Sequence, residues 1–246
     1  MKKKIGFFDF TGCEGCQLSI LGMDEEFLEV LELVEIVEFR QILDALPGQV
    51  LDIAFVEGSV CTAEEMERLR RIRKQSKVVV ALGACADLAG VNALRRLTPE
   101  AQLCRDVYGA VHDHLLPGEP QPLAAIIEVD YRLPGCPVIA TEFLSLLQSL
   151  LLDKEQELPG YSLCVECKLA EIPCTFERGE VCLGPVTRAG CQAICIDAGD
   201  RCRGCRGPID NPRLSPYRQI LYDHGLTLED VLQEFKTFNF SIDKDA

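Results

Sequence analysis

The sequence lacks several features that define common classes of protein. No apolar run approaches the roughly 18–20 residues that a membrane-spanning helix needs, so we expect no membrane span. There is no phosphate-binding P-loop, no GxGxxG fingerprint and no internal repeat. Positive charge is scarce: 25 Lys and Arg against 39 Asp and Glu leave a formal net charge of −14. Because nucleic-acid binding depends on basic patches, we expect no nucleic-acid partner.

The N-terminus does not develop into a secretion signal. Three lysines follow Met1, but Asp9 interrupts the short apolar stretch that comes next. No small-residue cleavage site and no twin arginine follow. We therefore expect a cytoplasmic protein, whose thiols stay reduced and whose many cysteines are metal ligands rather than disulfides.

The pattern of apolar residues predicts strands that alternate with helices. Strands are predicted at residues 3–10, 34–39, 51–56, 77–82 and 123–129. Helices are predicted at residues 17–33, 62–75, 141–152, 215–224 and 227–236, with a helical or irregular segment ending near residue 96. Thr62 and Glu65 are spaced as a capping box at one of these starts. The alternation is typical of an α/β domain with a doubly wound parallel sheet.

A change in composition after residue 155 predicts two domains. A polar stretch that ends at Pro159-Gly160 is expected to link a domain over residues 1–155 to a small, irregular, cysteine-rich domain over residues 160–246. The second domain has little periodicity apart from its terminal helices. Metal is therefore expected to replace a hydrophobic core there.

Cysteines of the first domain follow its predicted strands. The five strand-end cysteines are Cys13, Cys16, Cys61, Cys85 and Cys136. Ligands of open α/β sheets lie outside the carboxyl ends of the strands, so four or five of these thiols are expected to meet at one edge. The Cys13–Cys16 pair alone is equally compatible with a thioredoxin-type redox pair, half a zinc site, part of an iron–sulfur cluster or a structural role. The arrival of Cys85 and Cys136 at the same edge favours a cluster.

Eight of the 14 cysteines lie in the second domain: Cys164, Cys167, Cys174, Cys182, Cys191, Cys195, Cys202 and Cys205. Two iron–sulfur clusters explain this density best, and two zinc ribbons are the rival interpretation, because the segment begins and ends with a CxxC pair. Three four-cysteine sites use twelve cysteines and leave Cys61 and Cys104. We expect Cys104 to be an inert buried thiol and Cys61 to be a non-ligand near the first site, although a ligand or redox role for Cys61 stays open.

Other chemistry-bearing residues are few. Glu14 and Glu57 flank the first group of cysteines and are candidate proton-relay carboxylates, although turn or helix-start roles explain them equally well. His112 and His114 flank Asp113 in what we expect to be a solvated loop. His224 lies near a predicted helix end, where the helix dipole accounts for it.

Taken in order, the motifs resemble those of the small subunit of nickel–iron hydrogenases. The motifs are Cys13-Glu14-Gly15-Cys16, Glu57-Gly58-Ser59-Val60, Gly83-Ala84-Cys85, Pro134-Gly135-Cys136-Pro137 and the eight-cysteine tail. The match covers nearly the whole chain and is closest to the soluble, multimeric group that couples hydrogen to nicotinamide, ferredoxin or heterodisulfide partners. The resemblance implies that the first domain is flavodoxin-like.

The resemblance also implies three ligand sets, by motif position. A proximal cluster would be held by Cys13, Cys16, Cys85 and Cys136. A medial cluster would be held by Cys191, Cys195, Cys202 and Cys205. A distal cluster would be held by Cys164, Cys167, Cys174 and Cys182. Interleaved assignments within the tail remain open.

Two positions depart from the periplasmic enzymes of that family. Cys164 stands where those enzymes place a histidine ligand. Cys195 adds a fourth cysteine where their medial site has three cysteines and a three-iron cluster. Both departures favour 4Fe–4S clusters bound only by cysteine, which suit low-potential cytoplasmic acceptors.

The expected function is electron transfer within a hydrogenase, with no nickel–iron site on this chain. A separate large subunit would oxidise hydrogen, and an iron–sulfur or flavin reductase subunit would receive the electrons, in either direction of flow. Two rivals remain. One is a quinone-linked subunit like the related 20 kDa subunit of complex I, which has adjacent cysteines in place of Cys13–Cys16 and lacks the tail. The other is a zinc-stabilised interaction module without enzymatic activity.

Overall fold

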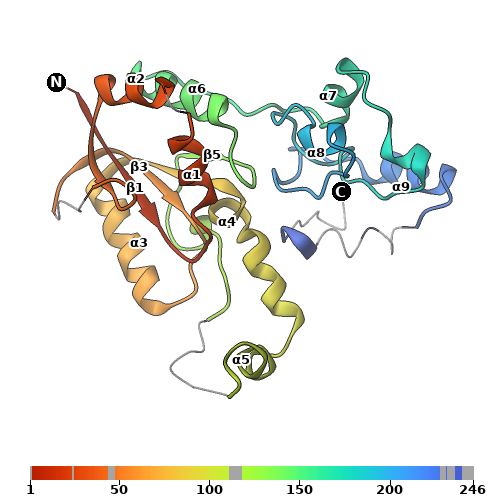
Figure 1. Cartoon of the computed structure of the whole chain (residues 1–246), viewed down its shortest axis with the longest axis horizontal. Coiled ribbons are helices and arrows are strands. Elements are labelled where there is room, and N and C mark those ends of the chain that lie inside the picture. Colours follow the sequence, from red (N-terminus) through yellow and green to blue (C-terminus); the bar gives the residue numbers. More distant parts are fainter. Residues whose placement is uncertain are drawn as a thin grey trace. The chain divides into compact units, whose positions relative to one another are not determined.

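The computed structural model describes residues 2–23, 25–43, 48–110, 118–227, 231 and 236–239 (Figure 1). By its internal contacts the chain divides into two compact units, Met1–Lys154 and Glu155–Ala246. We call them the sheet unit and the tail unit. No helix among the described residues is long and apolar enough to cross a membrane.

The sheet unit is built on a five-stranded sheet of order β2-β1-β3-β4-β5. The strands are β1 (Lys3–Asp9), β2 (Val34–Phe39), β3 (Leu51–Glu57), β4 (Ser76–Leu82) and β5 (Tyr131–Leu133). Every neighbouring pair of strands is parallel, which confirms the predicted α/β class and parallel sheet. All five strands therefore end at the same edge, where ligands of such sheets bind.

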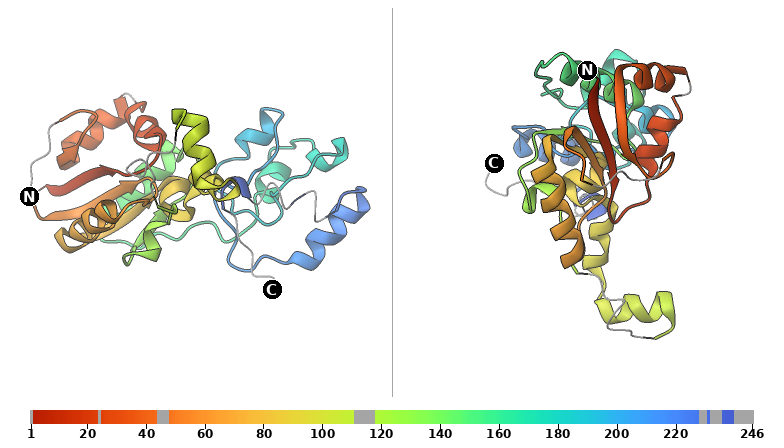
Figure 2. Two further views of the ribbon diagram at one scale, coloured as in Figure 1. Left: turned by 90° about the horizontal axis from the view of Figure 1, so that it is seen from below. Right: turned by 90° about the vertical axis from the view of Figure 1, so that its left-hand side faces the viewer.

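Helices cover both faces of this sheet (Figures 1 and 2). In chain order they are α1 (Gly15–Leu21), α2 (Glu25–Leu33), α3 (Ala63–Gln75), α4 (Gly83–Leu88), η1 (Gly90–Leu97), α5 (Glu100–Tyr108), η3 (Leu123–Ala125) and α6 (Ala140–Leu151). Helices α1, α2 and α6 bury apolar side chains on one face, and α3 does so on the other. Helix α3 begins with the predicted capping box, in which the Thr62 hydroxyl accepts the Glu65 N–H.

Alternation along the strands supplies a core on each face. In β1, Phe7 belongs to the cluster under α6 and Phe8 to the cluster under α3. The rings of Phe7 and Phe55 stack with centroids 5.0 Å apart, and Phe143 of α6 lies 5.1 Å from Phe55. Aromatic packing between neighbouring strands and a helix therefore anchors α6, which begins four residues after Cys136.

Three details differ from the sequence prediction. The helix expected at residues 17–33 is two helices, α1 and α2, separated by the turn at Gly22 and Met23. The prediction of a strand at residues 123–129 is wrong. These residues form the short helix η3 and a loop, whose apolar side chains pack on the core under α3. Pro122 precedes it, and the last strand is instead β5, paired with β4. Helix α5 was not predicted, and it stands away from the sheet (Figure 2).

The tail unit has short elements around a small core. They are α7 (Cys164–Leu169), η4 (Thr175–Arg178), α8 (Ile194–Asp197) and α9 (Leu214–Asp223). Helix α9 confirms the helix predicted at residues 215–224. Most of the helix predicted at residues 227–236 lies outside the described residues. Cysteines belong to the core itself: Cys182 and Cys202 are buried with Leu183, Tyr217 and Leu221.

We expect Phe55→Ala to destabilise the chain by about 3–5 kcal/mol, because the residue is fully buried and contacts two other rings. Urea unfolding of the full chain, followed by circular dichroism, measures the change. Val107→Ala on α5 is the control, since Val107 is 69% exposed. Equal loss of stability in both variants would contradict the assigned core.

Candidate metal centres

The first group of cysteines lies at the carboxyl edge of the sheet. Cys13 and Cys16 follow β1, Cys85 lies in α4 directly after β4, and Cys136 follows β5. The pKa of the Cys85 thiol is raised to about 12, first by burial and then by the charges of Cys136 and Cys13. Burial, Glu57 and Cys136 likewise raise the pKa of Cys16. These four thiols therefore lie near enough to interact, as the strand ends predicted.

Glycines allow this close approach. Gly83 has φ of +83°, and a Cβ at this position would overlap the Cys16 sulfur. The Ala84 N–H donates to the Gly135 carbonyl over 2.7 Å, so the segments around Cys85 and Cys136 are tied together. The peptide bond between Cys136 and Pro137 is cis. The space beside Cys16 is thus kept free of side-chain carbon.

Glu57 reaches this edge from the end of β3 and is 4% exposed. Its two carboxylate oxygens accept the N–H groups of Cys16 and Gln17, over 2.9 and 3.0 Å. Helix α1 has no side-chain cap of its own at its first turn. Glu57 therefore supplies the acceptors that this helix start needs and fixes the backbone at Cys16.

Glu14 lies in a different setting from Glu57. It is the N-cap residue of α1, with φ of +60°, and its carboxylate accepts hydrogen bonds from Arg40 and Gln41. Arg40 also pairs with Asp9 at the end of β1. Glu14 thus belongs to a surface network of charges, whereas Glu57 is enclosed. A proton-relay role for either residue stays a prediction.

The two spare cysteines of the sheet unit are both buried. The Cys61 sulfur lies 3.8 Å from the Ser59 hydroxyl, and the Cys61 N–H donates to Glu65 over 2.7 Å. The Cys104 thiol donates to the Ala110 carbonyl over 3.2 Å. Cys104 is therefore buried, as expected, and it is also hydrogen-bonded.

In the tail unit, four thiols interact around α7. The pKa of Cys164 is raised to about 12, first by burial and then by Cys182, Cys167 and Cys174. The pKa of Cys167 is raised to about 11 by burial, Cys182 and Cys174. Gly184 lies between two of the sulfurs, since a Cβ there would be 3.4 Å from Cys182 and 3.5 Å from Cys164.

The remaining four tail cysteines form two interacting pairs. Burial raises the pKa of Cys191, and the charge of Cys195 adds to the increase. The pKa of Cys202 is raised well above its usual value by burial, by Cys182 and by Cys205. How these pairs combine into one ligand set stays a prediction, because two of them also interact with the group around α7: Cys202 with Cys182, and Cys191 with Cys167.

Two charged residues near the tail cysteines were not anticipated from the sequence. Arg206 is 2% exposed, and its Nε–H donates to the Ala189 carbonyl over 2.8 Å. Glu166 of α7 accepts the Gly190 N–H over 2.7 Å. The only sequence feature that could have pointed to Arg206 is that a charged residue directly follows Cys205 in a glycine-rich segment.

Of the three histidines, only His224 lies in the part of the chain that the structure describes. His224 stacks on Phe176, with ring centroids 5.6 Å apart. His112 and His114, with Asp113 between them, lie outside the described residues. Within the described ranges no group of three or more His, Cys, Asp or Glu side chains is arranged to hold a single metal ion.

The donor set fits iron–sulfur clusters. The 14 cysteines, all of which lie in the described ranges, form no disulfide, and those with raised pKa values are driven toward the neutral form by burial and by one another. Buried thiols that repel one another as anions become favourable ligands when they bind a group that carries positive metal ions. A four-iron cluster takes four cysteine thiolates, each on a separate iron.

Residues 13–150 match the model of the family described as "NADH ubiquinone oxidoreductase, 20 Kd subunit". Sulfhydrogenase 2 subunit delta of Pyrococcus furiosus is 35% identical over 240 residues, 96% of this chain and 98% of that protein. A subunit of the F420-non-reducing hydrogenase of Methanococcus voltae is 33% identical, over 85% of this chain and 83% of that protein. A chain in a crystal structure of an NAD+-reducing [NiFe]-hydrogenase is 32% identical with a TM-score of 0.59, over 65% of this chain and 96% of that one.

The chain belongs to the family of the 20 kDa subunit of NADH ubiquinone oxidoreductase. Within this family it is a small, electron-transfer subunit of a nickel–iron hydrogenase, which confirms the assignment from the motifs. The family match ends at residue 150, before the eight-cysteine tail, whereas the match to the Pyrococcus furiosus protein covers 96% of the chain. Small subunits of this kind carry iron–sulfur clusters, in keeping with the 14 cysteines.

We expect Glu57→Gln to destabilise the chain by about 1–3 kcal/mol, because an amide offers only one oxygen to the two N–H groups and leaves one unsatisfied. Urea unfolding of the full chain measures the change. Glu67→Gln on the exposed side of α3 removes the same charge and should be near neutral. The assigned role would be wrong if the two variants unfolded at the same urea concentration.

In folded protein from which iron has been removed, we expect Cys85 to react slowly with iodoacetamide. A pKa of about 12 leaves roughly 10³-fold less thiolate at pH 8 than an ordinary cysteine has. Its rate should rise about tenfold per pH unit from pH 7 to 10, because the thiolate fraction keeps growing below the pKa. Site-resolved mass spectrometry measures the rate, with exposed Cys13 as the reference. A Cys85 rate that levels off near pH 9 would contradict the raised pKa.

Proposed function

We propose that this chain relays electrons between a nickel–iron large subunit and a reductase subunit, through three 4Fe–4S clusters bound by twelve of its cysteines. The observation that carries the proposal is the arrangement of the thiols. One group lies at the ligand-binding edge of the sheet, and the others lie in a tail that the hydrogenase relative matches as well.

We assign the ligand sets by motif position, and the interactions of Cys85 and Cys164 with neighbouring thiols support the proximal and distal sets. The proximal set is Cys13, Cys16, Cys85 and Cys136. The distal set is Cys164, Cys167, Cys174 and Cys182, and the medial set is Cys191, Cys195, Cys202 and Cys205. When bound, each cluster supplies a site that takes up and releases one electron at a time. The protein holds the thiols in place, excludes water from them and directs hydrogen bonds and charges at them.

The proximal group has a buried side and an exposed side. Cys16 and Glu57 are enclosed by the sheet unit, whereas Cys13 and Cys136 are exposed. We infer that the large subunit covers the exposed thiols, so that hydrogen oxidation takes place close to the proximal set. Glu57 is not part of the exposed side, because it is buried and acts through the Cys16 backbone.

The acceptor is a low-potential partner that contains iron–sulfur clusters or flavin, reached through the face near Cys164 and Cys182. NAD(P), ferredoxin and heterodisulfide remain the candidate terminal couples. The similarity to a chain of an NAD+-reducing hydrogenase supports the first of these. We place the complex in the cytoplasm, where reduced thiols are available for cluster binding. Flow in either direction is compatible with this arrangement.

Iron and acid-labile sulfide analysis of the anaerobically purified complex tests the cluster content. After the iron of the other subunits is subtracted, we expect about twelve iron and about twelve sulfide atoms per copy of this chain, because three 4Fe–4S clusters hold four of each. Zinc without sulfide would establish the zinc-stabilised module instead. A three-iron signal in fresh anaerobic protein would contradict the all-cysteine medial site.

Cys85→Ala tests the relay itself. We expect it to lose about four irons and most hydrogen-dependent viologen reduction, because a proximal ligand is removed. Cys104→Ala removes a buried cysteine of the same unit that lies outside the proposed set. This variant should keep its iron content and its hydrogen-dependent viologen reduction. Full activity in Cys85→Ala, or equal loss in both variants, would overturn the proposed proximal set.

A further inference from the structure

Arg206 is an unusual residue for the interior of the tail unit. It is among the largest fully buried side chains of the described residues, at 2% exposure, and it directly follows Cys205. Its Nε–H donates to the Ala189 carbonyl over 2.8 Å. A buried guanidinium is costly to desolvate, so its position beside the tail cysteines calls for a physical reason.

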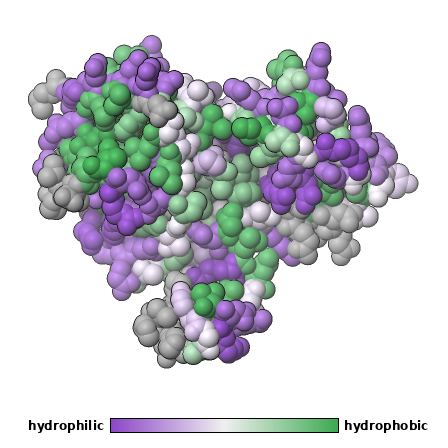
Figure 3. Space-filling model, viewed as in Figure 1, coloured by the Kyte–Doolittle hydropathy of each residue, from purple (hydrophilic) through white to green (hydrophobic). Residues whose placement is uncertain are grey.

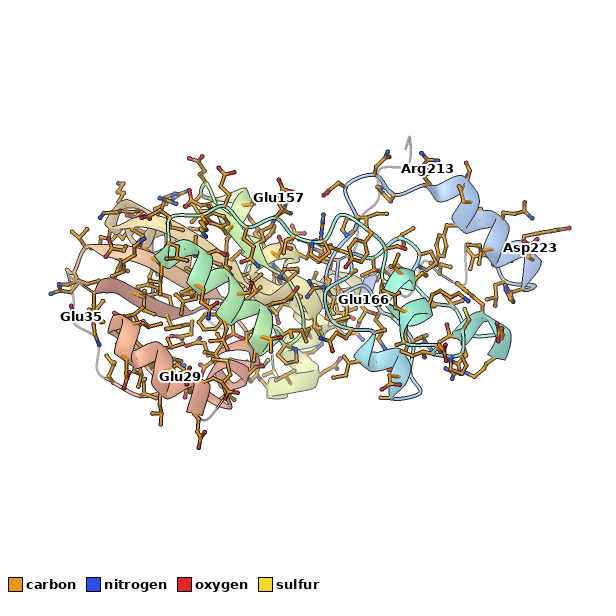
Figure 4. The ribbon with its side chains drawn as sticks, turned by 90° about the horizontal axis from the view of Figure 1, so that it is seen from above. Glu29, Glu35, Glu157, Glu166, Arg213 and Asp223 are labelled. Carbon is orange, nitrogen blue, oxygen red and sulfur yellow. The ribbon has the colours of Figure 1, made fainter. Side chains whose placement is uncertain are left out.

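The partner of Arg206 leads directly to a second cysteine. Ala189 lies two residues before Cys191, and Gly190 between them donates its N–H to Glu166 over 2.7 Å. One short backbone segment is thus held by Arg206 at its carbonyl and by Glu166 at its amide. Figure 4 labels Glu166 on α7. Two charges of opposite sign therefore meet the backbone that leads into Cys191.

Arg206 is therefore next to two of the assigned ligands. It directly follows Cys205, and its guanidinium donates to the carbonyl two residues before Cys191. A positive charge held this close stabilises negative charge on those sulfurs or on a metal group bound to them, and the carboxylate of Glu166 at the Gly190 amide opposes it.

We propose that Arg206 sets the midpoint potential of the cluster bound through Cys191, by stabilising its reduced state with a buried, permanent positive charge. The proposal rests on the proposed function. Reduction adds one electron to the cluster, supplied by the relay, and no bond of the protein forms or breaks. A guanidinium stays protonated at all working pH values, so its contribution does not change with pH. Burial keeps that contribution from being screened by salt.

The test is a redox titration of the anaerobically purified complex, followed by electron paramagnetic resonance. In Arg206→Gln we expect the reduced-to-oxidised ratio of one cluster to fall on the order of tenfold at a fixed potential, since one nearby charge is lost. For a one-electron couple this is a shift of about 59 mV to lower potential. The other clusters should shift less, and Arg206→Lys should retain most of the native potential.

Arg203→Gln is the matched control. Arg203 follows Cys202 as Arg206 follows Cys205, but its side chain is 42% exposed and pairs with Asp200. The control should leave all midpoints within error, because solvent screens an exposed and paired charge. Equal shifts in Arg203→Gln and Arg206→Gln, or equal shifts in Arg206→Gln and Arg206→Lys, would overturn the proposal.

A structural role of Arg206 is a separate outcome. Arg206→Met keeps an apolar stem in the buried position and is the second neutral variant. If both neutral variants lose iron while Arg206→Lys keeps it, Arg206 maintains the fold and the tuning role is rejected. Failure of the proposed function would appear differently, as wild-type protein that lacks iron and sulfide.

Discussion

The structure depends on one constraint, which is that crowded and largely enclosed thiols ionise only at high pH unless they have a positive partner. Burial and mutual repulsion raise the pKa values of Cys85 and Cys164 to about 12 in the chain alone. Thiolate is the form that binds metal, so ligand binding and deprotonation occur together. The protein therefore gathers its thiols in positions that are unfavourable for free anions and become favourable when iron neutralises them. The sheet and the tail satisfy this constraint in different ways.

In the sheet unit, the fold provides the geometry before any metal binds. The carboxyl ends of parallel strands meet at one edge, and the helices on both faces bury an apolar core that does not include Cys13 and Cys136. Glu57 completes this edge, because its carboxylate joins the end of β3 to the start of α1. The tail unit has no such scaffold. Its core contains Cys182 and Cys202 themselves, so its packing and its ligand positions are not separable.

Much of this arrangement could be predicted from the sequence, for identifiable reasons. Strands β1, β3 and β4 were predicted because their apolar runs end at or near glycine, and their ends located Cys13, Cys16 and Cys85. Cys136 follows β5, which was not predicted. The strand prediction at residues 123–129 was wrong because an apolar run indicates burial but not strand pairing. These apolar side chains belong to a short helix and a loop that pack on the core. Helix α5 was not predicted because little of its surface packs against the rest of the sheet unit. Val107 and Tyr108 are exposed, and Figure 3 shows apolar side chains at the surface of this helix.

The charges around the cysteines could not be predicted, because their effect depends on burial and not on residue type. Arg203 and Arg206 both directly follow a cysteine of the tail, and the sequence alone does not distinguish them. In the structure one is exposed and paired with Asp200, and the other is enclosed and bonded to the Ala189 carbonyl. A charge influences a cluster strongly only where solvent is excluded, since water and salt screen charges that are exposed. The potentials of a relay are therefore a property of its packing, even where every ligand is a cysteine.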